Sequence, residues 1–201
     1  MSIFFEILDQ AKAQSFLELI AVISAIFYIV FVIRENIICW FFASISAIIY
    51  IWLFIEAKLY MESMLNVCYL AIAVYGWYQW INGQTENSNK PIISWPPIIH
   101  VQAIITLLTL GSISGLLLMI YSDAVLPFLD SFTTWFAIWA TFLVARKVIE
   151  NWWYWIVIDL VSAFIYWSQD LKLTSMLFLI YVFMVPFGIV SWTKSMKKYS
   201  S

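Results

Sequence analysis

Residues 151–167 read NWWYWIVIDLVSAFIYW and decide the class of fold. This stretch is apolar and aromatic along its length and contains one charged side chain, Asp159, near its middle. A membrane-spanning helix needs about 20 mostly apolar residues. A charged group at the centre of such a helix costs about 2.5–3.5 kcal/mol, so it faces a cavity or a partner and avoids lipid. The stretch therefore predicts a spanning helix that carries a buried acid.

The composition of the whole chain agrees with a membrane location. Of the 201 residues, 64% are hydrophobic and only 11% are charged, and the mean hydropathy is +0.92. Soluble domains carry about 25% charged residues. The net charge of -2 is small and says nothing about nucleic acid, but no run of Lys and Arg resembles a footprint for DNA or RNA, so nucleic acid is not expected as a partner. We expect an all-α integral membrane protein, because helices satisfy every backbone group within lipid.

Seven runs along the chain qualify, or nearly qualify, as spanning helices. They are residues 15–33, 37–55, 59–81, 98–120, 131–144, 151–167 and 173–192. Residues 1–14 show helical spacing of apolar side chains and predict a short interfacial helix. The expected organisation is residues 1–97 as this helix and a first three-helix bundle, 98–130 as a linker helix, and 131–201 as a second bundle with a basic tail.

The chain also contains an internal repeat. Residues 31–34 match 143–146 at an offset of 112, Glu35-Asn36 matches Glu150-Asn151 at 115, and residues 63–65 match 175–177 at 112 again. On this alignment Trp40 pairs with Trp155, and Ser44 pairs with Asp159. The intervening fourth span gives both units the same orientation, so we expect a parallel 3+1+3 repeat. Transporters with such repeats bind their substrate between the repeats, near the middle of the membrane.

The distribution of Lys and Arg predicts the orientation. With seven spans, the amino-terminal side holds 3 of these residues and the other side holds 7. Because cytoplasmic loops are enriched in positive charge, the N-terminus is expected outside and the C-terminus in the cytoplasm.

The strongest candidate for a binding site is one face of the sixth span. Trp152, Trp155, Asp159, Ser162 and Tyr166 follow at steps of three and four, so they share a stripe on a helix. Indole and phenol rings flanking a carboxylate suit an aromatic cation, through stacking and cation–π contact worth about 0.5–2 kcal/mol each. The alternative is that Asp159 is protonated, or bonded to another helix for structural reasons.

Further candidates come from other spans. Trp40, Ser44, Asn66 and Glu18 are predicted to contribute to substrate binding, although Glu18 could also mark the membrane interface. Gln79 and Trp77 are candidates for an inner gate. Pro186 and Gly188 interrupt the seventh span and predict a hinge, since proline removes a helix hydrogen bond.

Enzymatic and metal chemistry find little support. The chain has one histidine and two cysteines without metal-ligand spacing, so neither a metal nor a cofactor is expected. The patterns GxSxG, HExxH and Walker A are absent from the sequence.

Two motifs resemble those of the PnuC-type vitamin transporters. They are YGWYQW at residues 75–80, and RKVIENW at residues 146–152 followed by Trp155 and Asp159. The resemblance covers residues 16–192. It implies a fold related to the SWEET sugar carriers, facilitated diffusion across a bacterial inner membrane, trapping of the substrate by a cytoplasmic kinase, and a homotrimer. It also places Trp152 and Trp155 at the binding site.

The resemblance leaves the substrate open. The family includes carriers of nicotinamide riboside, thiamine and riboflavin, and the first two are aromatic cations. Some nicotinamide riboside carriers have Asn at the position of Asp159, whereas an acid suits the exocyclic amine of thiamine. We therefore expect thiamine, with nicotinamide riboside as the alternative. Two further hypotheses are a proton-coupled carrier that uses Asp159 or Glu18, and a scaffold subunit that binds no ligand.

Overall fold

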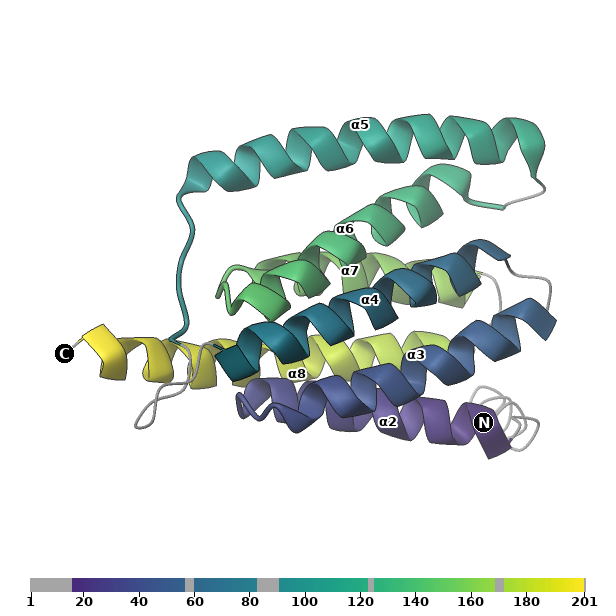
Figure 1. Ribbon diagram of the computed structural model, residues 1–201. Coiled ribbons are helices and arrows are strands. Elements are labelled where there is room, and N and C mark those ends of the chain that lie inside the picture. Colours follow the sequence, from purple (N-terminus) through teal and green to yellow (C-terminus); the bar gives the residue numbers. More distant parts are fainter. Residues whose placement is uncertain (1–15, 57–59, 83–90, 123–124, 169–171, 201) are drawn as a thin grey trace, which may run out of the picture.

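The computed structural model describes residues 16–56, 60–82, 91–122, 125–168 and 172–200. The secondary structure of this part consists of seven helices (Figure 1), with one isolated bridge between loop residues. They are α2 (Phe16–Ile33), α3 (Ile38–Glu56), α4 (Tyr60–Asn82), α5 (Pro97–Tyr121), α6 (Pro127–Arg146), α7 (Asn151–Ser168) and α8 (Lys172–Ser200). Each of the seven predicted spans corresponds to one of these helices. The interfacial helix expected at residues 1–14 lies outside the described residues.

The outer surface of the helices is apolar. In the described part of the chain, five helices are long and apolar enough to cross a membrane, namely α2, α3, α5, α6 and the Thr174–Lys198 portion of α8. The other two, α4 and α7, are of similar length and contain Asn66 and Asp159. Large side chains such as Phe164 (63% exposed) and Val74 (64% exposed) point outward. Lipid tolerates such a surface and water does not.

Six helices form a closed ring, and the seventh lies outside it. Around the ring each helix packs against the next, in the order α2, α3, α4, α6, α7, α8 and back to α2. Helix α5 packs against α6 and lies along one side of the bundle (Figure 1). Helices α2–α4 are therefore the first half of the ring, α6–α8 are the second half, and α5 connects them.

The two halves are related by a constant offset of 112 residues. Adding 112 to the bounds of α2, α3 and α4 gives those of α6, α7 and the first 23 residues of α8 to within one residue. Glu35 and Lys147 are 112 apart, and they are the two described non-glycine residues with positive φ, at 53° and 57°. Each of them follows the first helix of its half, so the helix ends are built alike.

This offset corrects part of the sequence alignment. The insertion that matched Glu35-Asn36 to Glu150-Asn151 is wrong, because the backbone turn at Glu35 is repeated at Lys147. The counterpart of Trp40 is therefore Trp152 and not Trp155. Similarly, the counterpart of Asp159 is Ala47 and not Ser44.

The two equivalent turns meet between the halves. Lys147 Nζ lies 2.9 Å from Glu35 Oε2, and the two side chains are 2% and 11% exposed. The same ammonium group lies 4.6 Å from the centre of the Trp80 ring. The chain leading to α5 joins this region, because Ile93 exchanges backbone hydrogen bonds with the residues on either side of Val148. These contacts hold the two halves and the linker together at the end of the ring where the C-terminus lies (Figure 1).

Candidate functional site

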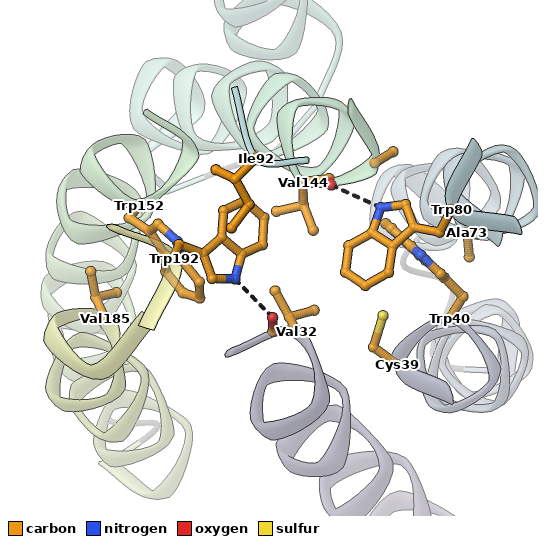
Figure 2. Close-up of a cluster of buried hydrophobic side chains, with 11 residues drawn as sticks. Val32, Cys39, Trp40, Ala73, Trp80, Ile92, Val144, Trp152, Val185 and Trp192 are labelled. Carbon is orange, nitrogen blue, oxygen red and sulfur yellow. Dashed lines mark hydrogen bonds between the residues drawn. The ribbon is translucent and has the colours of Figure 1, made fainter. Parts of the chain in front are cut away.

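Four buried indoles close one end of the ring. Trp40, Trp80, Trp152 and Trp192, which we call the tryptophan cluster, are each 2% exposed or less. Trp40 meets Trp80 edge to face at 5.6 Å and 84°, and Trp152 meets Trp192 in the same way at 5.4 Å and 84°. Figure 2 shows the two pairs on opposite sides of the cluster. Each half therefore supplies one pair of identical geometry.

Each pair also bonds to the opposite half. Trp80 Nε1 donates to the carbonyl oxygen of Val144 over 3.4 Å, and Trp192 Nε1 donates to that of Val32 over 2.9 Å (Figure 2). Val32 and Val144 are themselves repeat counterparts. The cluster is thus tied across the boundary between the halves by two equivalent hydrogen bonds.

Two glycines make room for these indoles. A Cβ atom at Gly76 would collide with the ring of Trp40, and one at Gly188 would collide with the ring of Trp152. Helix α8 is continuous from Lys172 to Ser200 and contains Pro186 within it. The helix is thus not interrupted at Pro186 and Gly188, and the hinge expected there stays a prediction. Gly188 provides the close approach that Trp152 requires. The signature at residues 75–80 has the same explanation, since its glycine accommodates Trp40.

Asp159 lies about two helical turns from the tryptophan cluster along α7. Its side chain is 2% exposed, and Oδ1 has no hydrogen-bond partner among the described residues. It interacts electrostatically with Tyr69 of α4 and Tyr181 of α8, which are repeat counterparts. A buried carboxyl oxygen without a partner costs free energy, so the fold retains a group that a ligand can satisfy.

The other members of the predicted stripe have different surroundings. Trp152 belongs to the tryptophan cluster, whereas Trp155 is half-buried and packs beside Ala137, Ala140 and Ile158. Ser162 is 7% exposed, on the same side of α7 as Asp159. Tyr166, further along, stacks on Phe178 of α8 at 5.3 Å. The stripe thus lies on a buried or half-buried face of α7 over its whole length.

Residues expected from other spans are distributed more widely. Asn66 is buried, and its amide donates to the carbonyl of Glu62 on the same helix over 2.8 Å. Glu18 is half-buried and interacts electrostatically with Tyr50. Gln79 is half-buried and directly precedes Trp80 of the tryptophan cluster in the sequence.

Ser44 and Trp77 lie on the outside of the bundle. They border a cavity of about 290 Å³ between α3 and α4, together with the exposed Val74 and Tyr78. Ser44 Oγ donates to the Trp40 carbonyl over 2.8 Å. A second cavity of about 290 Å³ lies between α5 and α6. Neither of these two cavities borders Asp159, whose surroundings are closed in this conformation.

Sequence reasoning missed two features of this region. Tyr69 and Tyr181 were not proposed as site residues, although they match at the offset of 112. The Glu35–Lys147 pair was hidden by the inserted gap, which a constant offset of 112 removes. Among the described residues no group of His, Cys, Asp and Glu side chains is placed to hold a metal ion.

Comparison with known proteins agrees with these observations. The nicotinamide riboside transporter PnuC of Escherichia coli is 25% identical over 213 residues, which cover 93% of this chain and 89% of the relative. The one from Neisseria mucosa is 25% identical and is covered over 75% of its length. A riboflavin/roseoflavin transporter, RibM of Streptomyces davaonensis, is 26% identical over 61% of this chain and 59% of the relative.

A solved structure shares the fold. The crystal structure of the vitamin B3 transporter PnuC superposes with a TM-score of 0.73 at 23% identity, covering 98% of this chain and 90% of that one. Residues 15–194 match the nicotinamide mononucleotide transporter family. The protein therefore belongs to this family and is a multi-pass membrane transporter of the bacterial PnuC type, and not an enzyme.

Proposed function

We propose that this protein carries nicotinamide riboside across the bacterial inner membrane. The observation that carries the proposal is the buried Asp159 carboxyl, which has an unpartnered oxygen and lies inside the ring. The pyridinium ring of nicotinamide riboside is a flat cation, which a carboxylate and indole rings attract. The relatives named as nicotinamide riboside transporters support this substrate over thiamine, the first expectation from the sequence.

Thiamine is the second candidate, because its exocyclic amine and thiazolium ring suit an acidic side chain at position 159. An acid both attracts a cation and accepts from an amine, whereas an amide at this position would do only the latter. Riboflavin has no positive charge, so Asp159 offers it no charge attraction.

The proposed path of transport follows from the closed end of the ring. With the N-terminus outside, the tryptophan cluster lies on the cytoplasmic side, and the vitamin reaches Asp159 from the other end. Rocking of the two halves about their shared contacts then opens the cytoplasmic side. Net uptake would be passive and maintained by phosphorylation of the vitamin in the cytoplasm.

The assembly is proposed to be a homotrimer. Helix α5 lies outside the ring and contacts it through α6. Apolar side chains of α5 such as Ile105 (60% exposed) and Leu117 (50% exposed) remain uncovered and are available for contact with a second copy of the chain. Native mass spectrometry of the detergent-solubilised protein tests this assembly, and a monomer alone would contradict it.

The substrate is tested by calorimetric titration of the purified protein with nicotinamide riboside, thiamine and riboflavin. We expect nicotinamide riboside to bind most tightly. Tighter binding of thiamine would support the second candidate, and no binding of any of the three would contradict the function. Uptake into liposomes under an imposed pH gradient separates the mechanisms, since a passive carrier gives a rate independent of the gradient.

A further inference from the structure

A second polar group lies inside the ring, on the half opposite Asp159. Tyr28 of α2 is half-buried, and its hydroxyl is buried without a hydrogen-bond partner among the described residues. Its ring packs against Trp40 of the tryptophan cluster at 6.0 Å and 53°. The ring is therefore held in place while the hydroxyl remains unsatisfied, an arrangement that costs free energy unless a ligand or water completes it.

Tyr28 in the first half and Trp155 in the second half are both large aromatic residues, although they are not repeat counterparts of each other. By the offset of 112, Tyr28 corresponds to Ala140, and Trp155 corresponds to Ala43. The second half thus combines a large residue on α7 with a small one on α6, and Trp155 packs beside Ala140. The first half reverses this order, with the large residue on α2 and the small one on α3. Each half therefore presents one large aromatic residue at this level of the ring.

Tyr28 and Asp159 also share neighbours. Both interact electrostatically with Tyr69 and Tyr181, the pair of tyrosines contributed by α4 and α8. The two unsatisfied oxygens, one from each half, are therefore both within electrostatic range of the same pair of phenols.

We propose that Tyr28 is a ligand-contacting residue that forms the first-half wall of the binding site and hydrogen-bonds a neutral polar group of the vitamin. The inference rests on the proposed function. Asp159 opposes the positive charge, Trp155 covers one face of the aromatic ring, and Tyr28 covers the other. The hydroxyl can donate to an amide carbonyl or accept from an amine, so Tyr28 distinguishes ligands by the neutral polar substituent that they carry, a carboxamide or an exocyclic amine.

The test is Tyr28→Phe, which removes the hydroxyl and keeps the ring that packs on Trp40. We expect the Kd of whichever of nicotinamide riboside and thiamine binds the wild type more tightly to rise about three- to tenfold, the effect of one hydrogen bond. The melting temperature without ligand should be unchanged or slightly higher. The matched control is Tyr78→Phe, because Tyr78 is 63% exposed on the outer surface, and its Kd should stay within about twofold of the wild type.

A purely structural role for Tyr28 predicts a different result. In that case Tyr28→Phe binds the vitamin as tightly as the control does, and the inference is overturned while the proposed function stands. Tyr28→Ala provides a second measurement, with an expected loss of more than about tenfold in affinity, since the wall is removed as well. If the wild-type protein binds none of nicotinamide riboside, thiamine and riboflavin, the proposed function itself fails and the inference fails with it.

Discussion

The two halves of the ring are nearly identical at one end and different in the middle. At the end with the tryptophan cluster, Trp40, Trp80 and Gly76 are repeated as Trp152, Trp192 and Gly188, with ring geometry that agrees to 0.2 Å in separation. In the middle the correspondence is only partial, since Tyr69 is repeated as Tyr181 whereas the residues around this pair differ between the halves. Asp159 corresponds to Ala47. The large aromatic residue of the second half is Trp155 on α7, whereas that of the first half is Tyr28 on α2.

This difference separates the scaffold from the site. Repeated residues bond across the halves, as the reciprocal bonds from Trp80 to Val144 and from Trp192 to Val32 illustrate. Where repeated residues have an unpartnered polar atom, as Trp40 and Trp152 do at Nε1, both halves have it, whereas the unpartnered Asp159 Oδ1 and Tyr28 hydroxyl have no counterpart in the other half. Functional groups commonly cost stability where structural groups contribute it. We therefore assign the symmetric part to the conformational framework and the asymmetric part to ligand recognition.

The largest effect is expected at the contact between the two equivalent turns. Glu35→Lys should destabilise the protein by about 3–5 kcal/mol, because it removes the partner of a buried ammonium group. Thermal unfolding in detergent measures the loss. The double variant Glu35→Lys with Lys147→Glu should recover most of the stability, since equivalent positions allow the two charges to be exchanged.

The exchange also tests the repeat itself. In the native protein Lys147 lies over the ring of Trp80, and the offset of 112 places a lysine at position 35 over Trp192. If the double variant is as unstable as Glu35→Lys alone, the two turns are not equivalent and the comparison of the halves fails.

A smaller effect is expected at the two glycines. In an open helix, replacing glycine by alanine stabilises by up to about 1 kcal/mol. At Gly76 and Gly188 the sign should reverse to a destabilisation of about 1–3 kcal/mol, because the added methyl group collides with an indole. Denaturant or thermal unfolding of Gly76→Ala and Gly188→Ala should give similar values. A stable Gly188→Ala beside an unstable Gly76→Ala would show that the two halves pack differently.

Much of the fold could be predicted from the sequence, because membrane helices are encoded by simple composition. Apolar runs of about 20 residues locate each helix without knowledge of its neighbours. Even the short run at residues 131–144 lies within a full helix, Pro127–Arg146. Scattered identities were also enough to identify the parallel repeat.

The register of the repeat could not be read from identities alone. Glu-Asn occurs in both halves, but at positions that are not equivalent, and the letters at the equivalent turns, Glu35 and Lys147, differ in charge. Their similarity lies in the backbone conformation. For the same reason Ser44 was placed inside the ring, although it borders a cavity on the outer surface.

The residues of the candidate site could be predicted only along one helix. Helical spacing relates Trp152, Asp159 and Ser162, because they share a face of α7. It contains no information about which residues of α2, α4 and α8 face them, so Tyr28, Tyr69 and Tyr181 were missed. These contacts depend on how the two halves close into a ring.

The most direct test of the central claim is the affinity of Asp159→Asn for nicotinamide riboside and thiamine, measured by calorimetric titration. We expect the Kd of the better ligand to rise more than tenfold, about 1.4 kcal/mol, with the melting temperature of the free protein unchanged or raised. Glu56→Gln, at an exposed position at the end of α3, is the matched control and should bind like the wild type. Wild-type affinity of Asp159→Asn for both vitamins would contradict the assignment of the asymmetric region as the binding site.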